Sequence, residues 1–221
     1  MKRILIMSSA IFLSFIWTQS AGMLAKPGEN LIAIEGLYEK EDIEGGSITT
    51  TAIIAEYVLN GNIEFGIQYM MGEAQNDEDS SYDFDISGLT LGGYYHFLKN
   101  PNLPFNIKFG GTYGSAEANA DWIDDAGVEI NAVSTSFGGG IYKEIYTQGV
   151  TNITGFFNFN SITAETTLKM EGHEDETEKD DFNSTALGIV VRSNNFFVTP
   201  KIGRTDGESD FSVTFGILFQ Q

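Results

Sequence analysis

The side chains able to do chemistry are few in this chain of 221 residues. There is no cysteine, so a thiol nucleophile and disulfide bridges are both excluded. The two histidines, His96 and His173, are too few for a histidine-rich metal site. The glycine run 138–140 opens no helix after a strand, which favours close packing over phosphate binding. The sequence therefore predicts no catalytic site, no firm metal site and no cofactor.

Acidic residues dominate the remaining polar groups. The chain has 31 Asp and Glu against 12 Lys and Arg, a formal net charge of −19. Nucleic acid is therefore excluded as a partner, because phosphate binding needs clustered Lys and Arg. Several acids cluster without the ordered spacing of an EF-hand loop, and a solvated surface is the favoured interpretation. Weak binding of divalent cations is the alternative for Asp77, Glu78, Asp79, Asp121, Asp124, Asp125, Glu174, Asp175 and Glu176.

A second set of ionisable residues lies within segments of alternating polarity. By parity, all of these residues fall on the face opposite the bulky apolar side chains. We expect the acids of this set to pair with its bases in an enclosed charge network. The set comprises Glu35, Glu56, Glu64, His96, Lys108, Arg192 and Lys201.

The alternation itself predicts the elements that position these residues. Apolar and polar residues alternate with period two in ten segments bounded by turn residues, which is typical of β-strands. The lengths suit tilted membrane-spanning strands of about 9–11 residues. The predicted strands are about 31–39, 48–59, 63–71, 86–97, 105–113, 131–142, 150–160, 184–192, 196–204 and 211–219.

The composition of the two strand faces distinguishes a membrane barrel from a soluble one. A soluble barrel would present a Lys- and Glu-rich face to water. Here the less apolar face carries mostly Gly, Ser, Thr and Asn, as in Ser134, Ser136, Gly138 and Gly140. Small polar residues suit a cramped, wet interior, while the large apolar residues face lipid. Because lipid leaves no partner for an open sheet edge, the sequence predicts a closed, all-β, antiparallel up-and-down transmembrane barrel.

The connections alternate in length and charge. Short turns are expected at 60–62, 98–104, 143–149 and 193–195, and longer acidic loops after the odd-numbered strands. This is the pattern of short periplasmic turns and longer outer loops. An even strand count then places both termini in the periplasm. Bulges are expected at Pro200, which lacks a backbone donor, and near Asn160, where the alternation slips.

The first 22 residues have the features of a secretory signal peptide. Lys2 and Arg3 precede an apolar stretch, Ile4–Trp17, and a zone of small residues follows it. We therefore expect a signal peptide over residues 1–22 and a barrel over residues 23–221. No later apolar run approaches the length of a membrane-spanning helix.

The aromatic end of the chain, Asp210–Phe219, completes a resemblance. With the signal peptide and the alternating strands, the chain resembles the small bacterial outer-membrane β-barrels such as OmpX and the membrane domain of OmpA. The resemblance implies that Phe215, Ile217 and Phe219 are the signal read by the barrel-assembly machinery, although the chain continues to Gln220–Gln221. Those relatives have eight strands, which is the alternative to the ten expected here.

Three functions are compatible with such a barrel. The first is a structural or surface-interaction role, in which acidic loops contact divalent cations, lipopolysaccharide or other cells. The second is a narrow, cation-leaning diffusion channel, because ten strands leave only a small lumen. The third and least favoured is an omptin-like surface protease, which would have to use His173 in a loop tip. The favoured expectation is a protein that is not an enzyme.

Overall fold

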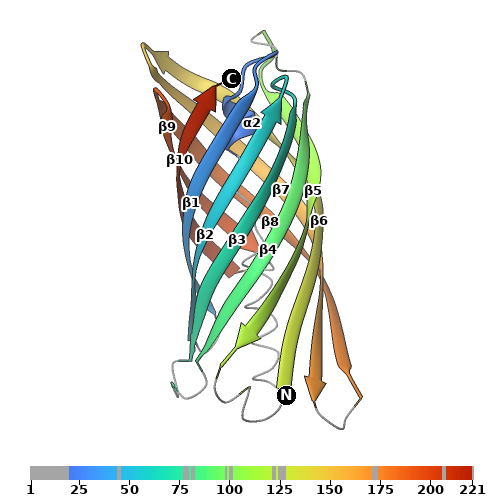
Figure 1. Cartoon of the computed structure of the whole chain (residues 1–221). Helices are drawn as coiled ribbons and strands as arrows, with labels where there is room; N and C mark the ends of the chain where they lie inside the picture. The colour runs from blue at the N-terminus through green and yellow to red at the C-terminus, as the bar shows by residue number, and fades with distance from the viewer. Residues whose placement is uncertain are drawn as a thin grey trace.

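Ten antiparallel strands close into one barrel in the computed structural model, in which each strand pairs with its sequence neighbours and β1 pairs with β10 (Figure 1). The structure describes residues 20–43, 46–76, 80, 83–97, 99, 102–120, 123, 128–170, 174–205 and 208–220. The elements are the short helix α2 (Ala21–Leu24) and the strands β1 (Leu31–Ile43), β2 (Gly46–Leu59), β3 (Ile63–Asn76), β4 (Phe84–Phe97), β5 (Asn106–Asn119), β6 (Val128–Gln148), β7 (Thr151–Met170), β8 (Glu176–Ser193), β9 (Phe196–Thr205) and β10 (Glu208–Gln220).

The predicted fold class is confirmed, with ten strands rather than eight. Each predicted segment corresponds to one strand, and several strands are longer than predicted. The extra length is greatest in β6, β7 and β8. β6 runs on to Gln148, β7 continues to Met170 and β8 starts at Glu176. The extensions of β7 and β8 pair with each other as far as Leu168 and Glu176, so these two strands form a hairpin that continues beyond their predicted ends. Among the described residues, no helix has the length and hydropathy needed to cross a membrane.

The two ends of the barrel differ in their connections. At one end, which we call the turn end, tight turns join β2 to β3, β6 to β7 and β8 to β9. Asn60 and Gly61 have φ angles of 52° and 71°, and Asn194 and Gly149 also have positive φ. Two successive residues of positive φ suit the right-handed twist of a hairpin. β1 starts and β10 ends at this end as well, and the opposite end is called the loop end (Figure 1).

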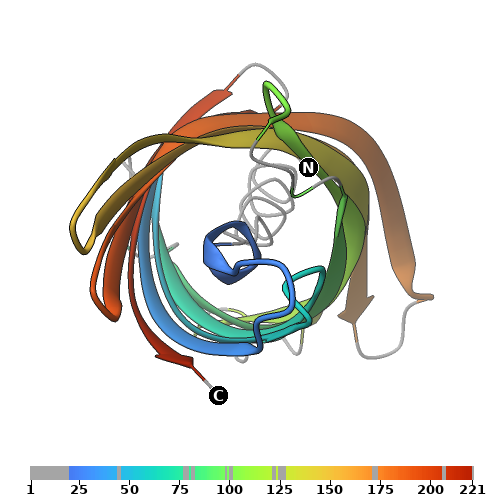
Figure 2. The same cartoon turned by 90° about the horizontal axis from the view of Figure 1, so that it is seen from above.

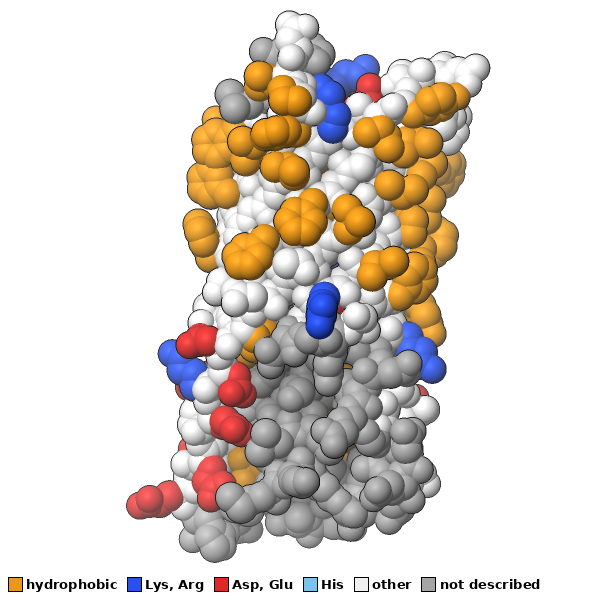
Figure 3. Space-filling view, turned by 180° about the vertical axis from the view of Figure 1, so that it is seen from behind, with side chains coloured by type: hydrophobic (Ala, Val, Ile, Leu, Met, Phe, Trp, Pro, Cys, Tyr) orange, Lys and Arg blue, Asp and Glu red, His pale blue; other side chains and the backbone are white. Residues whose placement is uncertain are grey.

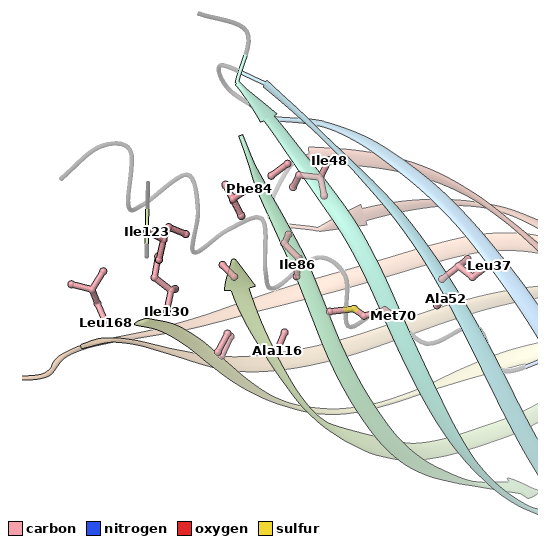
Figure 4. Packing of buried hydrophobic residues seen from close by; sticks show 14 of the residues in the cluster. Leu37, Ile48, Ala52, Met70, Phe84, Ile86, Ala116, Ile123, Ile130 and Leu168 are labelled. Carbon is pink, nitrogen blue, oxygen red and sulfur yellow. The ribbon is translucent and has the colours of Figure 1, made fainter. Parts of the chain in front are cut away.

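Alternate side chains point into the lumen, and not all of them are small and polar. In the half nearer the loop end, inward residues form a buried apolar cluster, the loop-end cluster (Figure 4). Its larger members are Leu37, Ile48, Ile54, Met70, Phe84, Ile86, Ile123, Ile130 and Leu168. The expectation of a uniformly wet interior is therefore wrong. Strands such as β2 carry apolar residues on both faces, as at the adjacent Ile53 and Ile54, and a search for one apolar face does not register the second.

The bulge expected near Asn160 is absent, and a register shift occurs elsewhere. The register of β7 runs without a shift through Asn160, because the apolar residues beyond it simply move to the inward face. The shift that does occur lies in β6, between Glu144 and Tyr146, inside a segment predicted to be a turn. β6 extends through that segment to Gln148, so the predicted turn at 143–149 shrinks to its end.

Pro200 produces a gap in one ladder instead of a bulge. Its pairing with Val213 on β10 is retained. On the β8 side, the register is the same before and after the proline, but no pairs form between Gly188↔Lys201 and Val191↔Val198. The missing backbone donor thus interrupts pairing without adding a residue. An outward-facing apolar groove of about 560 Å³, lined in part by Leu187 and Pro200, lies at this gap.

Candidate functional site: the lumen and the outer surface

The outward face of the barrel is apolar on every strand. Exposed large apolar side chains come from all ten strands, among them Ile53, Phe137, Leu187 and Phe215, each more than 60% exposed. They form a broad band that ends before the acidic residues near the loop end (Figure 3). Monomeric soluble proteins rarely expose such contiguous apolar area. Phe109 and Phe157, which a soluble barrel would bury, lie in this band as well.

The inner face holds a buried charge cluster near the turn end. Six of the seven charged residues predicted for the lumen are at most 3% exposed: Glu35, Glu56, Glu64, His96, Lys108 and Lys201. The seventh, Arg192, is half-buried at the mouth of the turn end, where its Nε donates to the carbonyl of Asn194 at 2.8 Å. The structure therefore brings six of the seven into the lumen and leaves Arg192 apart.

Helix α2 lies inside the ring of strands (Figure 2), and its first two residues contact this cluster. The backbone N–H of Ala21 donates to Glu56 Oε2 at 3.0 Å, and that of Gly22 donates to Glu64 Oε1 at 2.8 Å. A side chain on Gly22 would not fit, because its Cβ would lie 2.2 Å from His96 Nε2. Two carboxylates thus hold the first two residues of the helix against the barrel wall.

Glu64 also links the helix to the neighbouring strands. Its Oε2 lies 2.9 Å from His96 Nε2, and His96 Nδ1 lies 3.1 Å from the hydroxyl of Tyr142. This chain runs from β3 through β4 to β6 across the lumen. Lys108 faces the same carboxylates, with its Nζ 5.7 Å from the centre of the Tyr94 ring.

The remaining charges of the lumen are unequally matched. Glu35 lies beside Glu56 and Ser20, yet neither of its oxygens accepts a well-formed hydrogen bond from the described residues. Lys201 approaches Glu39 instead, with 4.0 Å between Nζ and Oε1. Glu35 and Glu56 therefore face Lys108, whereas Glu64 faces Lys108, Lys99 and the imidazole of His96.

Lys99, in the connection between β4 and β5, closes the other end of the helix. Its Nζ donates to the backbone carbonyls of Gly22 and Ala25. Cations are favoured at a helix C-terminus, where the carbonyls are unpaired. Burial lowers the pKa of Lys99 to about 8, with the nearby Glu64 and Glu29 partly opposing that shift.

Apolar packing completes the closure of the turn end. Met23 and Leu24 of α2 belong to a second buried set, the turn-end cluster, with Ala21, Ala25, Leu31, Ala33, Val58, Tyr142, Phe156, Val190, Phe197 and Leu218. Beyond the helix, a vestibule of about 510 Å³ opens at the turn end and is lined by Glu29, Lys99, Glu144 and Arg192 among others. The helix thus lies between this vestibule and the charge cluster.

Only some of the acidic residues predicted to bind cations lie within the described part of the chain. Glu174, Asp175 and Glu176 lie exposed at the end of the β7–β8 hairpin. Asp77, Glu78, Asp79, Asp121, Asp124 and Asp125 lie outside the described residues, as does His173, which the protease hypothesis requires. Within the described ranges, no three His, Cys, Asp or Glu side chains converge closely enough to hold a metal ion.

Solved structures of similar shape are membrane barrels. The β-domain of the Bordetella autotransporter BrkA matches with a TM-score of 0.50 and 9% identity, over 88% of this chain and 100% of that one. The transport unit of the Escherichia coli autotransporter AIDA-I gives 0.48 and 12%, over 100% and 98%. The outer membrane protein OprG from Pseudomonas aeruginosa gives 0.42 and 10%, over 89% and 99%. No family model and no curated protein sequence matches the chain. At such identities the likeness shows the fold alone.

The chain is a transmembrane β-barrel of the outer-membrane type. The apolar band fits the lipid-facing surface of such barrels. Phe215, Ile217 and Phe219, which the resemblance marks as the assembly signal, lie on that surface of β10 with 62%, 38% and 48% of each side chain exposed. Their backbone pairs with β1 or β9 and closes the barrel.

Sequence reasoning missed four contributors to the site: α2, Glu39, Lys99 and Tyr142. Parity could have found Glu39 and Tyr142, because both lie in phase with the inward residues of β1 and β6. The helix gave no such signal. It begins in the small-residue zone that marks signal-peptide cleavage, and four residues are too few for helical periodicity to be recognised.

Proposed function

We propose that this protein is a closed barrel of the bacterial outer membrane with a structural or surface-interaction role. Both termini would lie in the periplasm, and the acidic loops would face outside. The observation that carries the proposal is the filling of the lumen. α2 and its charge cluster block the turn end, and the buried apolar side chains of the loop-end cluster line the other half.

This filling argues against a permanently open aqueous pore. Inward apolar side chains such as Ile54 and Met70, at most 1% exposed, would contact water if the lumen were hydrated. Each exposed apolar Å² costs about 25 cal/mol. The lumen charges are equally inaccessible, whereas ion-conducting lumens present their charged groups to water.

The projecting hairpin supports a surface role. Residues 174–181 are all exposed, and they carry six acids: Glu174, Asp175, Glu176, Glu178, Asp180 and Asp181. Lipopolysaccharide carries phosphates, so a divalent cation could join the two acidic surfaces. We therefore propose lipopolysaccharide, bridged through divalent cations, as the partner of the loops, with the barrel-assembly machinery as the partner during biogenesis.

Planar-bilayer recording on purified protein tests the closed state. The proposal expects a silent membrane at moderate voltage. Stable, discrete current steps from the wild-type protein would overturn it in favour of the narrow channel.

Lipopolysaccharide binding tests the surface role. Purified barrel in detergent is mixed with lipopolysaccharide micelles, with Mg²⁺ or with a chelator. Neutralising Glu174, Asp175 and Glu176 to Gln should weaken the Mg²⁺-dependent binding at least threefold. Glu144→Gln, an exposed acid at the turn end, is the matched control and should leave binding unchanged. Equal binding by all three proteins would remove the hairpin from the proposal.

The channel is retained as a second candidate because of one observation. The vestibule brings solvent-accessible space up to α2 from the turn end. Because α2 separates that space from the charge cluster, conduction would require the helix to leave its seat. Such a channel would be gated by its own N-terminal segment, and its acidic lumen would favour cations.

A further inference from the structure

The small-residue zone before the barrel offers two bonds that fit signal-peptide cleavage. Signal peptidase requires small residues at the first and third positions before the bond that it cuts. Thr18 and Ser20 satisfy this for the Ser20–Ala21 bond, and Ser20 and Gly22 satisfy it for the Gly22–Met23 bond. The sequence does not choose between them.

The lumen distinguishes the two products. Cleavage after Gly22 would remove both residues whose backbone N–H groups bind Glu56 and Glu64. Cleavage after Ser20 retains both. Ala21 is fully buried, and Gly22 fits against the Glu64–His96 pair as only glycine can. The site is shaped for a chain that still contains both residues.

The charges of the lumen point to the same bond. Glu35, Glu56 and Glu64 lie together, each at most 2% exposed. Lys99 and the imidazole of His96 lie near Glu64, whereas Lys108 is shared among all three carboxylates. Buried charges are stable only when paired, and Glu35 accepts no well-formed hydrogen bond from the described residues. One further cation beside Glu56 and Glu35 would reduce the deficit.

We propose that signal peptidase cuts the Ser20–Ala21 bond and that the α-ammonium group so formed binds in the lumen to Glu56 and Glu35. Hydrolysis consumes one water molecule. Ser20 leaves with the signal peptide as a carboxylate, and the nitrogen of Ala21 gains protons to become an ammonium group. That nitrogen already lies 3.0 Å from Glu56 Oε2. The proposal places the domain boundary after residue 20, two residues before the expected one.

The departure of Ser20 makes room for the new charge. Ser20 is fully buried beside Glu35, and its hydroxyl lies 3.0 Å from that of Thr199. An α-amino group is protonated at neutral pH and has three donors, whereas the peptide N–H has one. The carboxylate cluster thus becomes a binding site for the processed N-terminus of the same chain. This inference rests on the export of the chain, which belongs to the proposed function.

Two measurements on protein purified from outer membranes test the proposal. The intact mass should correspond to a chain that starts at Ala21. An amine-reactive ester should label the α-amino group at least tenfold more slowly in the folded barrel than in urea. Lys26 is the internal control, because its side chain is exposed five residues further on and should react at similar rates in both states. A start at Met23, or an α-amino group labelled as fast as Lys26 in the folded barrel, would overturn the proposal.

A pair of refolded chains separates the ammonium group from the helix itself. One chain starts at Ala21 and the other at Ser20, so the charge moves by one residue. The shorter chain also loses the Ser20 carbonyl that accepts the N–H of Leu24 at 3.3 Å, and this loss acts against the expected gain in stability. The chain from Ala21 should unfold at a higher urea concentration, and Glu56→Gln should abolish the difference between the two. Equal midpoints for the two unsubstituted chains would contradict the ion pair. An unprocessed chain in the inner membrane would instead contradict the proposed function, whereas a processed barrel with another first residue contradicts only this inference.

Discussion

Glu64 and His96 are joined across neighbouring strands of the lumen, with 2.9 Å between Oε2 and Nε2 and no more than 1% of either side chain exposed. The other oxygen of Glu64 accepts the N–H of Gly22. One carboxylate therefore fixes the imidazole and α2 at the same time. This shared contact makes the helix part of the barrel interior.

Replacing Glu64 by Gln should destabilise the barrel. The amide keeps the size of the side chain but removes the charge that His96 and Lys108 face, leaving buried polar groups poorly matched. We expect a loss of about 2–4 kcal/mol in the free energy of unfolding, as for other broken buried pairs. Urea unfolding in detergent micelles measures it. Glu165→Gln, at an exposed acid of β7, should change that free energy by less than about 0.5 kcal/mol. A Glu64→Gln barrel as stable as the wild type would contradict this role.

Adding one methyl group at Gly22 should dislodge the helix. The Cβ would lie 2.2 Å from His96 Nε2 and 2.6 Å from Glu64 Oε2, so the helix or these two hydrogen-bonded, buried side chains would have to shift. We expect Gly22→Ala to produce discrete current steps in planar bilayers, while the wild-type protein stays silent.

Gly36→Ala is the matched control for that recording. Gly36 lies on β1, and no atom lies within 4 Å of the position its Cβ would take. The substitution adds the same methyl group outside the lumen, so the membrane should stay silent. If the Gly22→Ala barrel is also silent, α2 is not what closes the lumen.

The fold could be predicted because the strands of a β-barrel follow a pattern that is local in the sequence. The alternation of apolar and polar neighbours around a residue such as Phe215 or Ile217 indicates that its side chain faces lipid. The position of Lys108 in the lumen follows in the same way. Period two fixes which face a residue occupies, so six of the seven expected charges were found inside.

The partners of those charges could not be predicted, because they depend on register across strands. Lys201 approaches Glu39, the last residue of the first predicted strand, and Arg192 contacts a backbone carbonyl at the turn end. Parity carries no information about height along the barrel axis. The inward-facing apolar residues were missed for a related reason, since Ile54 and Met70 lie beside apolar residues of the outer face.

Lys99 should make the free energy of unfolding depend on pH in the alkaline range. Burial lowers its pKa in the folded barrel to about 8, whereas a lysine in the unfolded chain titrates near 10.4. Between these values the unfolded state binds more protons, so the free energy of unfolding rises with pH in this window. We expect a rise of about 1 kcal/mol after allowing for partial exposure. Urea midpoints from pH 7.5 to 10.5 measure it.

The difference between the wild type and Lys99→Gln isolates this effect from other titrating groups. The variant should show a smaller rise across the same window, and Lys26→Gln, at an exposed lysine, should behave like the wild type. Parallel curves for the wild type and Lys99→Gln would show that Lys99 is not desolvated at the end of α2.

A lysine in the apolar band of the outward face should destabilise the barrel far more than a lysine outside that band. Ile53 lies near the middle of β2 with 62% of its side chain exposed. Lipid cannot solvate an ammonium group, so Ile53→Lys should lower the free energy of unfolding by about 2–4 kcal/mol in phospholipid vesicles. Glu165→Lys places the same group on an exposed position of β7, in the polar part of the hairpin, where water solvates it. That variant should stay within about 1 kcal/mol of the wild type. Equal losses of stability for the two lysine variants would mean that the outward face of β2 contacts water, and this would contradict the assignment of the apolar band to the membrane.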